Sequence, residues 1–195
     1  MKKNYFIFLC LLCFYTSFGQ RFNTPSSGKA IICFACVTYD PILGDIYHND
    51  KYIGEINYPY YSLHEVDSGN HLFWIEQRNN VAAGHFIEAD LEEGKIYVLL
   101  ISSISSFAVH NLDRKLILKP LDISDTLEYK RVKRLFKYVN PTILSQKELD
   151  KKNNKHATFI EKSLRKYQNF KEMGETEKIG VLLPDEYIPI EFLNN

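Results

Sequence analysis

Residues Ala30 to Val37 read AIICFACV, and residues Lys95 to Ser102 read KIYVLLIS. Both stretches are apolar at nearly every position, whereas a strand with one face in water alternates apolar and polar side chains. Each stretch therefore predicts a β-strand that is covered on both faces. An opposing sheet provides one cover, and we expect a helical segment further along the chain to provide the other.

Short segments of strand-forming residues, separated by turn residues, surround these two stretches. Asn49-Asp50-Lys51 is typical of a hairpin turn, and Glu92-Glu93-Gly94 is expected to join two further strands as a second hairpin. The spacing predicts an antiparallel β-sandwich of about seven strands over residues 30–121. Besides the two apolar stretches, the predicted strands are Asp45–His48, Tyr52–Ile56, Tyr60–Val66, His71–Arg78, Ala83–Leu91 and Lys115–Lys119.

Residues 122–195 predict a helical extension. Ser124 or Asp125 can cap a first helix over residues 127–139, and Ser145 begins a capping box with Glu148 for a longer second helix. The long helix carries an apolar stripe, which we expect to cover the outer faces of the two apolar strands: Leu149, His156, Phe159, Ile160, Leu164, Tyr167 and Phe170. The C-terminal tail, DEYIPIEFLNN, is apolar enough that we expect it to dock on the body. The chain is thus predicted to be mainly β with C-terminal α.

The first 19 residues have the pattern of a cleavable signal peptide. Lys2 and Lys3 precede an apolar run of about eleven residues, and small residues stand at the two positions that a signal peptidase requires before Gln20. The run is too short to cross a bilayer, which takes about 20 residues. Leu9 and Leu12 precede the two cysteines of this segment where a lipid-anchoring signal needs a small residue. The sequence predicts an exported protein, periplasmic or extracellular, without a lipid anchor or a transmembrane helix after cleavage, in which residues 20–29 form a flexible lead-in.

Charge divides the chain into two parts although the formal net charge is zero. Residues 28–121 contain 7 Lys or Arg against 12 Asp or Glu, whereas residues 122–178 contain 14 against 9. The overall balance argues against a nucleic-acid-binding protein, which usually has a strongly basic domain. The two surfaces can attract each other, or the basic helices can contact an acidic partner surface such as lipid phosphates.

Three short motifs are similar to the PEGA-type β-sandwich module, and in particular to an exported bacterial family of unknown function built on such a module. They are the hairpin Ile46–Ile56 (IYHNDKYIGEI), the segment Val66–Leu72 (VDSGNHL) and Gly94–Val98 (GKIYV). The resemblance covers residues 30–103 and not the helices. Asn57-Tyr58-Pro59-Tyr60 stands where the PEGA tetrapeptide would be expected. The resemblance implies a small sandwich and no catalytic residues.

Cys33 and Cys36 form a C-x-x-C pair, which is a nominal redox or metal motif. In an extended strand, residues three apart are about 10 Å apart and point to opposite faces, whereas a disulfide needs Cα atoms within about 6.8 Å. We therefore expect two buried free thiols, with a disulfide or a metal site as the alternatives. The histidines lack metal-site spacing and are interpreted as scattered strand residues rather than as a zinc site: His48, His64, His71, His85 and His110.

Polar clusters give no catalytic motif. Ser102, Ser103, Ser105 and Ser106 lack a nucleophile elbow, and the carboxylates of residues 88–93 are interpreted as a solvated turn rather than as a glycosidase pair. Four aromatic residues could form a platform for a sugar or peptide, but core and cross-strand packing is the favoured interpretation of them: Tyr58, Tyr60, Tyr61 and Trp74.

These observations favour a non-enzymatic interaction or structural module of the cell envelope, whose partner is an envelope protein or glycan. The alternatives are a hydrolase acting on an envelope polymer and a sandwich that binds a small ligand or sugar. No catalytic residue, metal or cofactor is predicted.

Overall fold

The computed structural model describes residues 22–37, 44–56, 58–77, 80–105 and 114–194, with the backbone alone at 80–84, 103–105 and 114–115. Within these ranges the chain forms nine strands, three α-helices and one short 3-10 helix. In chain order they are β1 (Lys29–Cys36), β2 (Gly44–His48), β3 (Lys51–Ile56), β4 (Tyr60–Asp67), β5 (Gly69–Gln77), β6 (Asn80–Leu91), β7 (Ile96–Ser105), β8 (Arg114–Pro120), α2 (Thr126–Tyr138), α3 (Gln146–Glu172), η1 (Thr176–Lys178), β9 (Ile179–Leu182) and α4 (Ile190–Asn194).

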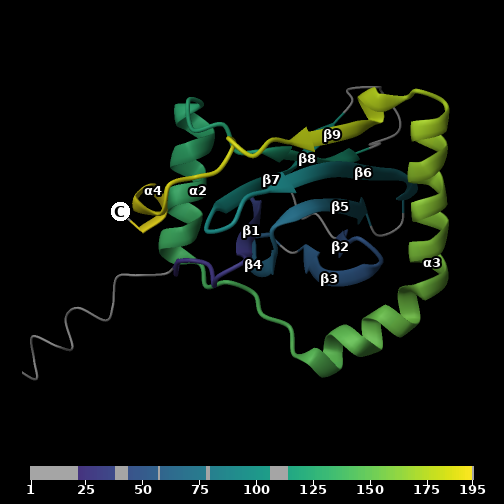
Figure 1. Cartoon of the computed structure of the whole chain (residues 1–195), viewed down its shortest axis with the longest axis horizontal. Helices are drawn as coiled ribbons and strands as arrows, with labels where there is room; N and C mark the ends of the chain where they lie inside the picture. The colour runs from purple at the N-terminus through teal and green to yellow at the C-terminus, as the bar shows by residue number, and fades with distance from the viewer. Residues whose placement is uncertain (1–21, 38–43, 57, 78–79, 106–113, 195) are drawn as a thin grey trace, which may run out of the picture.

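The strands form two mixed sheets. One has the order β4-β1-β7-β8, and the other has the order β3-β2-β5-β6-β9. The helices α2 and α3 lie on opposite sides of the strands (Figure 1). The prediction of a mainly β fold with C-terminal helices is confirmed.

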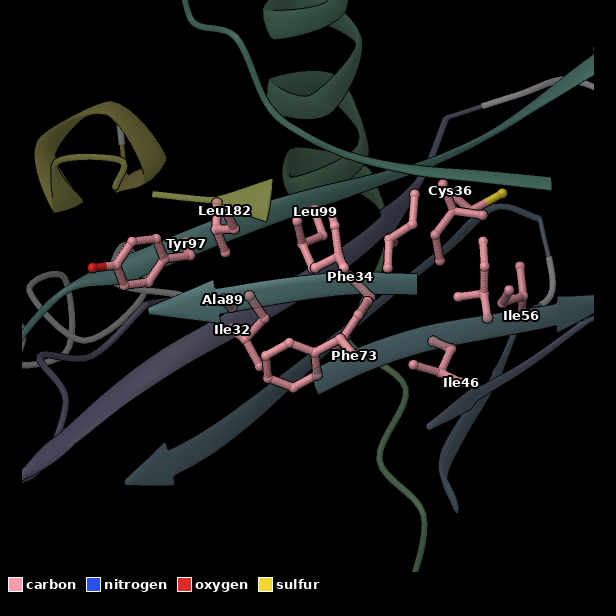
Figure 2. Packing of buried hydrophobic residues seen from close by; sticks show 14 of the residues in the cluster. Ile32, Phe34, Cys36, Ile46, Ile56, Phe73, Ala89, Tyr97, Leu99 and Leu182 are labelled. Carbon is pink, nitrogen blue, oxygen red and sulfur yellow. The ribbon is translucent and has the colours of Figure 1, made fainter. Parts of the chain in front are cut away.

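The inner strand β1 is buried on both faces, which explains why its residues from Ala30 to Cys36 are all apolar. Its side chains alternate between two cores: Ile32 and Phe34 point between the sheets, whereas Cys33 and Ala35 point to the outer face. The neighbouring strand β7 alternates in the same way, with Tyr97 and Leu99 pointing inward. Figure 2 shows the core between the sheets, where Phe34 of β1 meets Phe73 of β5 with ring centroids 5.6 Å apart.

The outer face of the β1 sheet is covered by α2 and the C-terminal tail. Val132, Leu135 and Phe136 of α2 pack there with Phe22, which precedes β1. The Phe136 ring lies 4.8 Å from that of Phe22 and 4.9 Å from that of Tyr61. This short helix therefore provides the second cover that the two apolar strands need.

The long helix α3 covers the other sheet. Its side chains pack on four aromatic residues of the outer face: Tyr47, Tyr52, Trp74 and Phe86. The expectation that α3 covers the two apolar strands is wrong. The outer face of β2, β3, β5 and β6 carries large aromatic surface, and burying such surface is what favours docking of the helix there.

The predicted antiparallel topology of about seven strands is also wrong. β1 pairs in parallel with β7, and β6 pairs in parallel with β9. The expected hairpin at Glu92-Glu93-Gly94 is not formed, because this segment carries the chain from β6 in one sheet to β7 in the other. The hairpin between β2 and β3 does form, and Asn49 adopts a positive φ of 52° at its turn.

The helix caps follow the sequence closely. The side chain of Asp125 caps α2 by accepting hydrogen bonds from the backbone N–H groups of Leu127 and Glu128. Ser145 and Glu148 form the predicted capping box of α3. Gly174 follows the last turn of α3 with a φ of +70°, which is the usual role of glycine at that position.

The end of the chain lies on the body. Ile188 is buried and donates its backbone N–H to the Ile96 carbonyl oxygen at 2.7 Å. The Asn194 side chain exchanges two hydrogen bonds with the backbone of Phe22, each 3.1 Å long. Within the described ranges, no helix is both long and apolar enough to cross a membrane.

Candidate functional site

The exposed face of α2 is strongly basic. Residues 130–137 read KRVKRLFK, in which the apolar positions Val132, Leu135 and Phe136 face the core. The basic residues between them must therefore face outward. Glu128 in the first turn is paired with Lys119 of β8 at 2.7 Å, so it does not offset the charges further along the helix.

A pocket of about 320 Å³ lies beside this face of α2. β1 and β4 pair as far as Cys36 and Tyr60, and the pocket is lined by residues just beyond that last pair, Val37, Tyr58 and Pro59. The second turn of α2 and the residues that follow it form the remaining wall: Arg131, Arg134, Leu135, Tyr138 and Val139. Residues three and four apart share one helix face, which is why these helix side chains line one wall.

The two arginines are the distinctive feature of the pocket. Within the described part of the chain, neither guanidinium forms an ion pair or a side-chain hydrogen bond. Some basic side chains elsewhere have acidic partners, as Lys171 has Glu88 at 2.8 Å and Arg165 has Glu161 at 2.6 Å. The pocket thus presents two guanidinium groups whose hydrogen-bond donors are available to a ligand.

The pocket is otherwise apolar and aromatic. Leu135 is buried, Val37 and Val139 are partly buried, and the rings of Tyr58 and Tyr138 are exposed. Lys137 adds a further positive charge near the rim, with its ammonium group 5.5 Å from the centre of the Tyr138 ring. No acidic side chain lines the pocket among the described residues. The arrangement can hold an anion beside an apolar group.

The four aromatic residues proposed from the sequence as a platform lie apart. Tyr60 is buried between the sheets, and burial raises the pKa of its hydroxyl. Tyr61 is buried beneath α2, and Trp74 is buried beneath α3, where it stacks on Tyr47 at 3.8 Å. Tyr58 is 38% exposed and is the member of the set that lines the pocket. The structure does not bring these four side chains together on one surface.

Three histidines lie near one end of the space between the sheets. His48 Nε2 and His71 Nδ1 are 2.8 Å apart, and His64 contacts the Phe34 ring. Burial lowers the pKa of His48 and of His64 to about 4 in each case. In the described residues, no group of three or more histidine, cysteine or acidic side chains is arranged to hold a metal ion. His85 lies on β6, whereas His110 lies outside the described residues.

The carboxylates of the predicted turn have structural roles where they are described. Glu88 accepts hydrogen bonds from Tyr167 and Lys171 of α3, and Glu93 accepts one from the backbone N–H of Gly28 at 2.6 Å. Of the four serines, Ser102 is partly buried on β7; the side chains of Ser103 and Ser105 and all of Ser106 lie outside what the structure describes.

A different pair of carboxylates is buried, which the sequence did not predict. Asp45 and Glu76 lie opposite each other on β2 and β5, and each is 7% exposed. Burial and the nearby Asp45 raise the pKa of Glu76 to about 7, although Lys166 partly opposes this shift. With so little exposure, neither carboxylate can reach a polymer in solution. The pair therefore does not favour the hydrolase alternative.

Cys33 and Cys36 are buried thiols that form no disulfide with each other, as the strand geometry predicted. Cys33 lies on the outer face of β1 and Cys36 lies on the inner face. Burial raises the pKa of the Cys33 thiol well above its usual value, which disfavours the reactive thiolate.

Sequence analysis did not identify the pocket itself. Tyr58 and Arg131 are far apart in the sequence, and only the docking of α2 on β4 brings their surroundings together. The available signal was the run of basic residues at 130–137, which contributes to the positive charge of residues 122–178. That signal indicated charge on a helix but not a cavity.

Comparison with known proteins assigns no family. No family of known sequences matches the chain, and a search of curated proteins finds no significant match.

Proposed function

We propose that this chain is a non-enzymatic binding module of the cell envelope, and that it binds an acidic partner through the pocket beside α2. The observation that carries the proposal is the pair of arginines at the pocket, which has no acidic partner within the described residues. Arginine holds carboxylates and phosphates through two parallel hydrogen bonds, and such charge-assisted bonds are the stronger ones in proteins.

The location in the envelope is supported by the sequence of residues 1–19, which has the pattern of an export signal. It is also supported by the resemblance of residues 30–103 to sandwich modules of exported bacterial proteins. The basic helix α2 turns the general expectation of contact with an acidic surface into a specific site. The sandwich and α3 then serve as the scaffold that holds this site.

The proposal is tested by sedimentation of the purified mature protein with the envelope fraction of its source cell. Arg131→Gln combined with Arg134→Gln should abolish co-sedimentation at physiological salt. The control is Lys155→Gln combined with Lys162→Gln, which removes the same charge from two exposed positions of α3. If the two double variants sediment alike, general electrostatic attraction explains the binding and the proposal is wrong.

A further inference from the structure

We infer that the ligand of the α2 pocket is a small anionic amphiphile, in which a carboxylate or phosphate is attached to an apolar group. This inference rests on the proposed function and specifies the ligand of the same site. It follows from the two kinds of surface that the pocket combines, from its size, and from the hydrogen-bonding capacity of the side chains that line it.

The polar side of the pocket can only donate at its charged groups. Arg131 and Arg134 each carry five N–H donors and no acceptor. Among the described residues that line the pocket there is no carboxylate, amide, serine or threonine side chain, and the side-chain oxygen acceptors are the hydroxyl groups of Tyr58 and Tyr138. A neutral sugar presents several hydroxyl groups that need acceptors as well as donors, and this pocket offers it far fewer acceptors than donors. A carboxylate or phosphate offers acceptors alone, and these match the N–H donors of the two arginines.

The apolar side requires a second feature of the ligand. Val37, Pro59, Leu135 and Val139 surround the guanidinium groups with apolar surface, and the rings of Tyr58 and Tyr138 extend it. A bare anion would leave this surface in contact with water. A ligand with an attached apolar group would bury it and gain about 25 cal/mol for each Å² removed from water. The pocket therefore favours an amphiphile over an inorganic ion.

The size of the pocket limits the ligand. A volume of about 320 Å³ lies at the lower end of the range of pockets that bind small molecules. This volume fits one ring or a short chain with its acidic group. The carboxylate and the phosphate share the same recognition chemistry, and direct comparison of the two separates them.

The test is calorimetric titration of the mature protein with two amphiphiles that carry one phenyl ring one atom away from the acidic group, phenyl phosphate and phenylacetate. Inorganic phosphate and acetate serve as probes of the anion alone, and benzyl alcohol serves as the probe of the apolar group alone. We expect at least one amphiphile to bind about tenfold more tightly than either of its halves. Whichever amphiphile binds more tightly identifies the acidic group. NMR signals of the Tyr58 and Tyr138 rings should shift on binding, which locates the ligand.

Two variants separate the contributions. Arg131→Gln combined with Arg134→Gln should lower the affinity for both amphiphiles by about tenfold or more. Lys155→Gln combined with Lys162→Gln should leave both affinities unchanged. Tyr138→Ser, at a position that is 70% exposed, should lower the affinity for the amphiphiles and leave the affinity for inorganic phosphate unchanged. Equal binding of inorganic phosphate and phenyl phosphate, or tight binding of the alcohol, would overturn the inference. Absence of any titration signal would also overturn it, while arginine-dependent sedimentation with the envelope would leave the proposed function standing.

Discussion

The side-chain amide of Asn153 on α3 hydrogen-bonds both backbone groups of Tyr52 on β3. It accepts from the Tyr52 N–H at 2.8 Å and donates to the Tyr52 carbonyl oxygen at 3.2 Å. Among the strands that the structure describes, β3 lies at the edge of its sheet, so no described strand pairs with its outward backbone groups. One asparagine side chain thus takes the place of a further strand at this position and fixes α3 to the sheet.

Asn153→Ala should therefore destabilise the protein, although alanine favours helix formation. The loss leaves two backbone groups of a partly buried edge without their partner, which costs about 1–3 kcal/mol. Denaturant unfolding followed by circular dichroism measures this change. Asn154→Ala, at the exposed neighbouring position, should have no effect or a slightly stabilising one. Equal effects of the two substitutions would show that α3 is not held at Tyr52.

Phe159 tests the packing of α3 on the aromatic face. Its ring lies 5.8 Å from that of Tyr47 and 5.9 Å from that of Trp74. Phe159→Ala should lower the free energy of unfolding by about 2–4 kcal/mol, since the ring is only partly buried. It should also shift the fluorescence of Trp74, the one tryptophan of the chain, towards that of a solvated indole. Lys162→Ala on the exposed face should leave both signals unchanged.

The arrangement of the helices explains what the sequence could and could not predict. β1 was predictable because its residues are apolar at every position from Ala30 to Cys36. Its parallel pairing with β7 was not, because a strand that is apolar on both faces carries no signal for the direction of its neighbours. Likewise, the stripe on α3 marks a buried face but does not specify which sheet it covers. The capping box at Ser145 is a local feature, and it was predicted correctly.

The candidate site was harder to predict for the same physical reason. An aromatic residue on a strand looks alike whether it faces a core or a ligand, so Tyr60, Tyr61 and Trp74 gave no sign of their burial. Local patterns also cannot bring Tyr58 to α2, because that contact depends on tertiary packing. The basic run of α2 was visible in the sequence, but the cavity beside it was not.

Glu76 should make stability fall as the pH rises. Its pKa is about 7 in the folded protein, above the usual glutamate value of 4.5, so between these two pH values the unfolded chain loses its proton first. The free energy of unfolding therefore falls progressively as the pH rises from 4.5 to about 7. Glu76→Gln should stabilise the protein by about 1–3 kcal/mol at pH 8 and have little effect near pH 4.5. A stabilisation that is equal at both pH values would rule out this linkage.

His64 should change stability in the opposite direction over a similar pH range. Its pKa falls from 6.5 to about 4 on folding, because of burial and then because of the nearby His48. Between these values the unfolded chain binds a proton that the folded chain does not, so stability falls as the pH decreases from 6.5 to 4. His64→Gln should remove up to about 3 kcal/mol of this acid dependence. Thermal unfolding at pH 7 and pH 4 measures it, and an unchanged difference between the two pH values would contradict the assignment.

The most direct test of the α2 site is the reactivity of individual arginines with phenylglyoxal, read by peptide mass spectrometry with and without the envelope fraction. Arg165 is 75% exposed on α3 and serves as the internal reference. If the pocket binds an acidic envelope component, Arg131 and Arg134 become protected when the envelope fraction is present, while Arg165 reacts as before. If the envelope fraction leaves the reactivity of Arg131 and Arg134 unchanged, as it does that of Arg165, the proposed binding site is contradicted.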